Sequence, residues 1–151
     1  MVISSLNTKL LEDRLGYITK SVVKLKAIAS LPKERFLMGD NPAAAESYLR
    51  RCLEAIFDIG RHIIAKTAGK AEVEYKEVVT RLREIGVITQ AHAENLKLMA
   101  GYRNRLVHFY DEVSDVELYQ IIQNNLGDIE EFVRQIAAFL EKYRQTQHPR
   151  Q

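Results

Sequence analysis

The 151-residue sequence has no long hydrophobic run. Charged residues interrupt its apolar stretches within a few positions, well short of the roughly 20 apolar residues that a membrane-spanning helix needs. The first residues, Met1–Asn7, also lack the basic start and the sustained apolar run of a secretion signal. We therefore expect a protein that stays in the cytoplasm and crosses no membrane.

Cysteine is nearly absent, and so is any strong excess of charge. The one cysteine, Cys52, cannot form an internal disulfide, and its apolar neighbours predict a small buried side chain rather than a reactive thiol. A net charge of +2 is too mild to indicate nucleic-acid binding by itself. The local groups of lysine and arginine are read, from composition alone, as solvated helix faces.

Most enzyme signatures are missing as well. The sequence has no phosphate-cradling glycine loop, no Cys-x-x-Cys, no His-Glu-x-x-His and no serine in a glycine elbow. Its four histidines include no pair at a spacing of three or four, which argues against a zinc site on a helix. Three of them have no evident chemical partner and are interpreted as structural or surface residues: His62, His92 and His148.

The spacing of the apolar residues predicts helices along nearly the whole chain, because they recur every three or four positions. Proline and glycine, together with capping residues, set the expected boundaries. These predict a first helix from about Leu11 that ends at Leu31–Pro32, a second from an Asn41 cap to Gly69, a short third over Tyr75–Glu84 stopped near Gly86, and a fourth capped by Thr89.

A fifth and longest helix is expected after Ser114. Ser114 and Glu117 have the spacing of a capping box, and the three-four rhythm of apolar residues then continues to Leu140. Gly127 costs about 1 kcal/mol relative to alanine, which is too little to interrupt so regular a pattern. Residues 144–151 are polar and are expected to form a frayed tail.

These patterns predict a single all-α domain over residues 1–151, with its core within about residues 5–143. Three long amphipathic helices with short connections indicate an antiparallel bundle of about five helices. A coiled-coil rod is the alternative, but the loops at residues 31–42 and 67–74 favour the compact bundle. No strand or internal repeat is predicted.

One segment concentrates polar residues without an obvious structural need, from Met99 to Asp111. Asn104 and His108 are four apart, so the amide could orient the imidazole while the helix continues. Arg103 and His108 are five apart, about 140° around a regular helix, and do not converge on it. Either the helix bends or ends here, or a second subunit completes the site.

An arginine, a histidine and a tyrosine together suit metal-independent cleavage of RNA. Histidine, with an ordinary pKa near 6.5, can take the proton of a ribose 2′-hydroxyl or return one to the leaving oxygen. Arginine offers forked donors to phosphoryl oxygens as negative charge builds. Tyr110 could hold a phosphate or assist proton transfer. From spacing alone, the alternative is a helix end with a cation near its terminal carbonyls.

The order Arg103-Asn104-x3-His108-x-Tyr110 resembles the Arg-x4-His-x-Tyr motif of HEPN domains, and specifically the HepT-like family of prokaryotic toxin–antitoxin pairs. Three further segments follow the order usual in that family: Tyr75–Glu77, Leu82–Ile88 and Met99–Asn104. The helix-rich first half and the long final helix also fit, so the resemblance covers roughly residues 5–143.

The resemblance implies a homodimer in which two motifs face each other across a cleft, with Arg103 and His108 as the catalytic pair. It implies cleavage of RNA without a metal ion or other cofactor, with Asn104 as the polar residue that follows the arginine. It also implies that Tyr110 is adenylylated by a partner, an MNT-type nucleotidyltransferase antitoxin. The added bulk and negative charge would inactivate the toxin.

Two other functions stay open. One alternative is a non-catalytic helical subunit that binds the nucleotidyltransferase and presents Tyr110 for modification. The other is a structural bundle without chemistry. Arg105 has no inherited role: it either contacts the RNA backbone or is an exposed or structural arginine.

Overall fold

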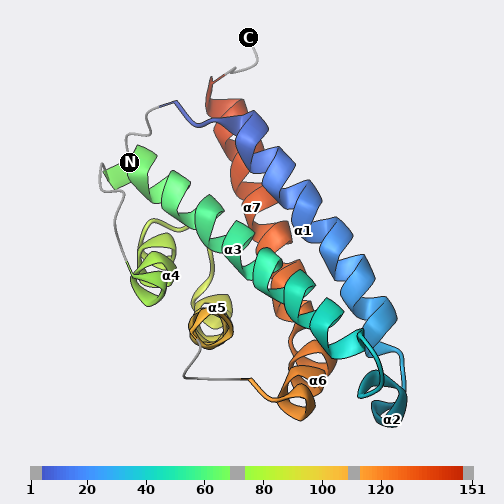
Figure 1. Ribbon diagram of the computed structural model, residues 1–151. Helices are drawn as coiled ribbons and strands as arrows, with labels where there is room; N and C mark the ends of the chain where they lie inside the picture. The colour runs from blue at the N-terminus through green and yellow to red at the C-terminus, as the bar shows by residue number, and fades with distance from the viewer. Residues whose placement is uncertain (1–4, 69–73, 109–112, 148–151) are drawn as a thin grey trace.

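The computed structural model describes residues 5–68, 74–108 and 113–147. Within these ranges the chain forms seven helices and no strand (Figure 1). The helices are α1 (Thr8–Ala29), α2 (Lys33–Phe36), α3 (Asn41–Ala68), α4 (Tyr75–Glu84), α5 (Gln90–Val107), α6 (Asp115–Asn124) and α7 (Leu126–Gln147). None of them is both long and apolar enough to span a membrane.

Three long helices form the body of the molecule. In Figure 1, α1 runs in the opposite direction to α3 and α7, and both of these helices pack against α1. Helices α4, α5 and α6 also contact α3 and lie along its other side (Figure 1). The prediction of an all-helical bundle is confirmed, and α3 is its central element.

Burial follows the predicted stripes. Five residues of α3, at spacings of three and four, are at most 1% exposed: Leu49, Cys52, Ile56, Ile59 and Ile63. The Cys52 thiol lies 3.8 Å from the Ile18 carbonyl oxygen, and burial raises its pKa to about 11. This thiol therefore stays protonated at neutral pH, as expected of a buried structural cysteine.

Local capping signals are confirmed where they were predicted. The Thr89 hydroxyl accepts a hydrogen bond from the His92 amide at 3.2 Å, and Ser114 does the same for the Glu117 amide at 3.1 Å. Gly86 has φ +81°, a conformation that glycine adopts without strain, and it follows the end of α4.

The prediction of one continuous final helix is wrong. The chain leaves regular helical geometry at Asn125, with φ −117° and ψ −1°, which separates α6 from α7. Helix α6 instead binds backbone carbonyl groups at and just after the C-terminal end of α1, which have no partner within that helix. The Tyr119 hydroxyl donates to the Leu31 carbonyl at 2.8 Å, and the Gln123 amide donates to the Ala29 carbonyl. These long-range bonds compete with a straight continuation.

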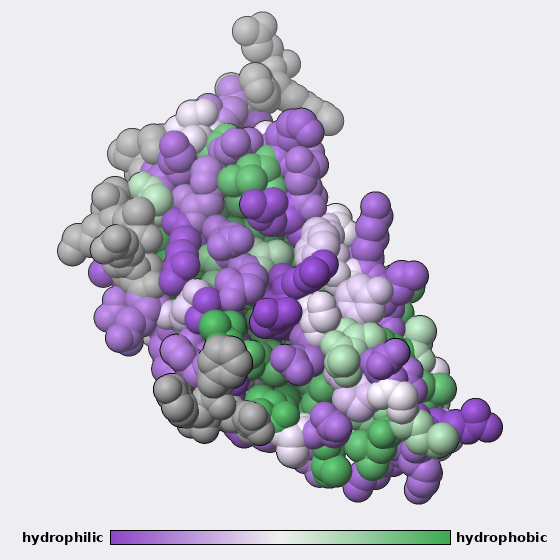
Figure 2. All heavy atoms as spheres, viewed as in Figure 1, coloured by the Kyte–Doolittle hydropathy of each residue, from purple (hydrophilic) through white to green (hydrophobic). Residues whose placement is uncertain are grey.

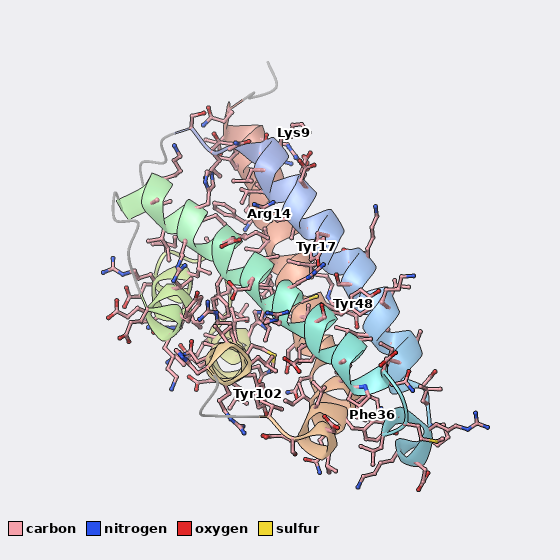
Figure 3. All side chains as sticks on the ribbon, in the orientation of Figure 1. Lys9, Arg14, Tyr17, Phe36, Tyr48 and Tyr102 are labelled. Carbon is pink, nitrogen blue, oxygen red and sulfur yellow. The ribbon has the colours of Figure 1, made fainter. Side chains whose placement is uncertain are left out.

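Two other boundaries also differ from the prediction. The region 31–42 contains the short helix α2, whose Phe36 is fully buried and points toward α6, where its ring lies 5.0 Å from that of Tyr119 (Figure 3). Asn41 is the first residue of α3 rather than its cap, since the Ala44 amide already donates to the Asp40 carbonyl at 2.9 Å.

Gly69, the predicted end of the second helix, lies outside the described residues. Helix α7 continues to Gln147 and so includes residues that were assigned to a frayed tail. On the face drawn in Figure 2, hydrophilic side chains cover most of the surface, and apolar ones gather near α2 and α6. Leu37, Met38 and Val116 are exposed there.

Gly60 allows α3 to approach α4 closely. A Cβ at this position would lie 2.5 Å from Cγ1 of Val78 and 3.2 Å from Cδ1 of Leu82, and Val78 is short, branched and buried. We expect Gly60→Ala to lower the free energy of unfolding by about 1–3 kcal/mol, although alanine favours a helix by about 1 kcal/mol.

Gly16→Ala is the matched control, because Gly16 is exposed within α1 and a Cβ there meets no atom within 4 Å. This variant should be as stable as the parent or slightly more stable. Thermal and urea unfolding of both variants measures the difference. Equal stability of the two alanine variants would contradict the close approach.

Candidate functional site

Residues of α3 and α4 hold the side chain of Arg103, which lies on α5. From α5, its Nε and Nη2 atoms lie 3.0 and 2.9 Å from Oε1 of Glu54 on α3. Its guanidinium carbon lies 4.0 Å from the ring centroid of Tyr75, the first residue of α4. The Arg103 side chain is only 15% exposed. An ion pair along one edge and an aromatic ring against one face thus fix its position.

Tyr75 is shared by a second arginine. The guanidinium carbon of Arg61 lies 4.4 Å from the ring centroid, and the buried Phe57 packs edge-on at 4.9 Å between ring centroids. Two guanidinium groups therefore surround one tyrosine, with Glu54 as the carboxylate bound to one of them. The Arg61 Nε atom is buried and has no hydrogen-bond partner among the described residues.

His108 lies just after α5 ends. The helix ends at Val107, and His108 takes an extended conformation with φ −93° and ψ 126°. Its imidazole is exposed, and it lines a pocket of about 440 Å³ together with side chains from α3 and α6. The described residues that line this pocket are Glu46, Arg50, Arg105, Leu106, Val107, His108, Val113 and Asp115.

Arg103 is not among the described residues that line that pocket. Helix α3 contributes side chains both to the pocket of His108 and to the binding of Arg103. Arg50 lines the pocket with His108, while Glu54, one turn further along the same helix face, binds Arg103. Arg50 and Glu54 therefore occupy neighbouring turns of α3, about 6 Å apart along its axis.

Asn104 contacts the arginine rather than the histidine. Its amide oxygen accepts a hydrogen bond from Arg103 Nη1 at 3.4 Å, whereas its backbone carbonyl accepts from the His108 amide at 3.1 Å. The amide does not orient the imidazole, because the helix ends between the two residues and the shared helix face is lost.

Arg105 connects the end of α5 to the first turn of α6. Its Nη1 and Nη2 atoms lie 2.6 and 2.7 Å from the two carboxylate oxygens of Glu117. This hydrogen bonding lowers the pKa of Glu117. Glu117 binds Arg105 with its side chain, while its backbone amide is bound by the Ser114 cap. The pairing supports the structural alternative for Arg105.

The remaining predicted residues fall elsewhere. The His62 ring accepts a hydrogen bond from the Asn7 amide at 3.1 Å, and burial, followed by nearby Lys66, lowers its pKa. His92 is buried between α5 and α7, and burial lowers its pKa despite the opposing charges of Glu131 and Asp128. Both are structural histidines, as expected. Tyr110 and His148 lie outside the described residues.

Sequence reasoning missed the α3 side of the site. Arg50, Glu54 and Arg61 recur at spacings of four and seven, which places them on one face of a helix. This charged stripe is a sequence signal for the site, separate from the buried stripe of the same helix. In the part of the chain that the structure describes, no group of three or more His, Cys, Asp or Glu side chains could hold a metal ion.

A family model described as Ribonuclease HepT-like matches residues 18–136, which include Arg103, Asn104 and His108. The chain belongs to the HepT-like family. This membership confirms the resemblance that the sequence motif carries.

Curated HepT proteins share its sequence. An mRNA nuclease HepT of Shewanella oneidensis is 36% identical over 90 residues, which cover 60% of this chain and 68% of that protein. A tRNA nuclease HepT of Aphanizomenon flos-aquae is 28% identical over 133 residues, which cover 87% of this chain and 90% of that protein.

The HepT-like fold is also shared with a solved complex. The structure of a tri-AMPylated HEPN toxin of Shewanella oneidensis in complex with an MNT antitoxin matches with a TM-score of 0.76 and 26% identity. The match covers 85% of this chain and 97% of the matched chain. The helical bundle formed by the described residues is therefore a HEPN-like fold.

Proposed function

We propose that this HepT-like chain is the toxin of a HEPN/MNT toxin–antitoxin pair and that it cleaves RNA without a metal ion. The observation that supports the proposal is that Glu54 and Tyr75 hold the Arg103 guanidinium, while His108, five residues later, is exposed and lines a pocket with Arg50 of α3. The nuclease names of the two curated relatives agree with it.

The proposed reaction needs only these side chains. The imidazole of His108 takes the proton of the ribose 2′-hydroxyl, whose oxygen attacks the neighbouring phosphorus atom, and a proton is then returned to the 5′-oxygen that leaves. Arg103 stabilises the negative charge that accumulates on the phosphoryl oxygens. This displacement leaves a 2′,3′-cyclic phosphate on one product and a 5′-hydroxyl on the other.

We further propose that the active form is a homodimer. Among the described residues, Arg103 does not line the pocket of His108, and a second copy placed against this region would bring the two motifs together around one cleft. Leu98 and Val107, before and after the arginine on α5, are 56% and 40% exposed. Apolar side chains of this kind are suited to burial against a second copy.

Replacing either member of the pair should abolish RNA cleavage. We expect Arg103→Ala and His108→Ala each to lower the cleavage rate by about 100-fold or more in the presence of a chelator, because each removes a group that acts in the transition state. The measurement is single-turnover cleavage of labelled RNA, with analysis of the product ends. Circular dichroism of each variant verifies that it is folded.

Undiminished cleavage by both variants would refute the proposal, since a contaminating nuclease would then explain the activity. Arg51→Ala is the matched control for the loss of an arginine. Arg51 is exposed on α3 and does not line the described pocket, so its loss should leave the rate unchanged.

We propose that Arg50 contacts the RNA backbone. It is exposed, it lines the pocket of His108, and no hydrogen bond or ion pair engages it among the described residues. An arginine in this position can bind the phosphate next to the one that is cleaved. Arg51 is its neighbour in sequence but points about 100° away around the helix.

The Arg50→Ala and Arg51→Ala pair tests this contact, because both changes remove the same charge. We expect Arg50→Ala to raise KM and to reduce the slope of log binding constant against log salt concentration by about 0.7, as for the loss of one phosphate contact. Fluorescence anisotropy with labelled RNA over a salt series measures the slope. Equal effects of the two changes would indicate a general charge effect instead.

We propose that an MNT-type nucleotidyltransferase adenylylates Tyr110 and so inactivates the chain. The position of Tyr110, two residues after His108, and the AMPylated HEPN toxin in the matched complex support this. The added phosphate would bring bulk and negative charge to the place where RNA phosphate binds.

A second candidate function is a non-catalytic subunit that binds the transferase. The limited exposure of Arg103, whose guanidinium already binds Glu54, favours it. Under this alternative the transferase modifies the chain, but the chain does not cleave RNA.

Intact mass and RNA cleavage, measured on one sample before and after incubation with the transferase and ATP, distinguish the two functions. We expect the mass to rise by whole AMP units while cleavage is lost, and Tyr110→Phe to gain no mass. Modification of a protein that cleaves no RNA beforehand would instead favour the non-catalytic subunit.

A further inference from the structure

The guanidinium of Arg103 is bound asymmetrically. Nε and Nη2 both donate to the same oxygen of Glu54, at 3.0 and 2.9 Å, whereas Nη1 has only a 3.4 Å contact with the neighbouring Asn104. Arginine binds phosphate best through two parallel donors of its planar fork. With one edge held by Glu54, the edge formed by Nη1 and Nη2 is the one left for a phosphate.

Tyr75 fixes the plane in which that edge lies. The guanidinium carbon is 4.0 Å from the ring centroid, and the ring is itself held edge-on by the buried Phe57. Arginine is otherwise a long, flexible side chain, and a group that is already oriented before the reaction stabilises a transition state more effectively. Glu54 sets the rotation within the plane and Tyr75 sets the plane.

The charges around Arg103 are compatible with an anionic ligand. Glu54 is the one carboxylate bound to this arginine, and Arg61 adds a second guanidinium 4.4 Å from the same ring. The group of Glu54, Arg61 and Arg103 therefore keeps one net positive charge. Glu54 is also 38% exposed, so water screens its charge and weakens its competition with a phosphate.

We infer that Glu54 is a positioning residue of the nuclease site: it holds Arg103 by the Nε and Nη2 atoms and turns the remaining edge toward the RNA phosphate that is cleaved. This inference rests on the proposed function, and it assigns a role to a residue of α3, 49 positions before the arginine. Glu54 itself touches no substrate.

The test compares Glu54→Ala, Glu54→Gln and Asp58→Asn in steady-state RNA cleavage by the full-length chain. We expect Glu54→Ala to lower kcat by about 10- to 100-fold with KM nearly unchanged, because the arginine is misplaced rather than lost. Glu54→Gln should recover part of kcat, since its amide oxygen can still accept from Nε and Nη2. Asp58→Asn removes an exposed carboxylate one turn further along α3 and should have no effect.

Two further measurements separate positioning from simple support of the fold. The Nε–H resonance of Arg103, assigned by its loss in Arg103→Lys, should exchange with solvent faster in Glu54→Ala than in Asp58→Asn. Tyr75→Phe keeps the ring and should keep kcat, whereas Tyr75→Leu should lower it. Thermal unfolding identifies any variant that fails to fold, and Glu54→Gln then provides the comparison.

The outcomes distinguish this inference from the function on which it rests. If Arg103→Ala abolishes cleavage but both Glu54 variants are as active as Asp58→Asn, Glu54 has no positioning role and the proposed function stands. Faster cleavage by Glu54→Ala would also overturn the inference, because the carboxylate would then compete with phosphate. Cleavage that survives Arg103→Ala overturns the proposed function, and the inference fails with it.

Discussion

The burial of α3 on opposite sides determines the rest of the structure. Helix α1 packs against α3, where the Cys52 thiol of the apolar stripe lies near the Ile18 carbonyl, and α4, α5 and α6 pack along the other side of α3. A helix that is contacted in this way cannot shift without disturbing most of the core, since protein interiors are closely packed. Charged residues on α3 are consequently held at fixed positions, although they lie near the surface.

This arrangement explains how a nearly neutral bundle can present an organised polar site. Glu54 projects from a rigid helix toward α5, and Tyr75 projects toward the same arginine from the start of α4. Each contact comes from a different helix, so the orientation of the guanidinium is a property of the packed bundle. The exposed His108, in contrast, depends mainly on the point at which α5 ends.

Features that depend on neighbouring residues could be predicted from the sequence. The caps at Thr89 and Ser114, the glycine after α4 and the buried stripe of α3 all follow from spacing and residue type. The break at Asn125 could not be predicted, because the apolar rhythm continues across it and the cause is a set of bonds from α6 to the end of α1.

The candidate site likewise has one part that could be predicted from the sequence and one part that could not. Arg103 and His108 stand out within one short segment, and a family resemblance gives them roles. The contact between Glu54 and Arg103 joins residues 49 positions apart, and neither periodicity nor capping rules pair such distant positions. The contact depends on how α5 crosses α3 in the folded bundle.

Gly60 has a consequence beyond stability. By leaving room for Val78, it sets how deeply α4 settles on α3, and Tyr75 lies one turn before Val78 on the same short helix. The depth of that contact therefore determines the position of the Tyr75 ring against the Arg103 guanidinium. A residue with no side chain of its own thus sets the spacing between α3 and α4, and a larger residue at this position would displace Tyr75 relative to Arg103.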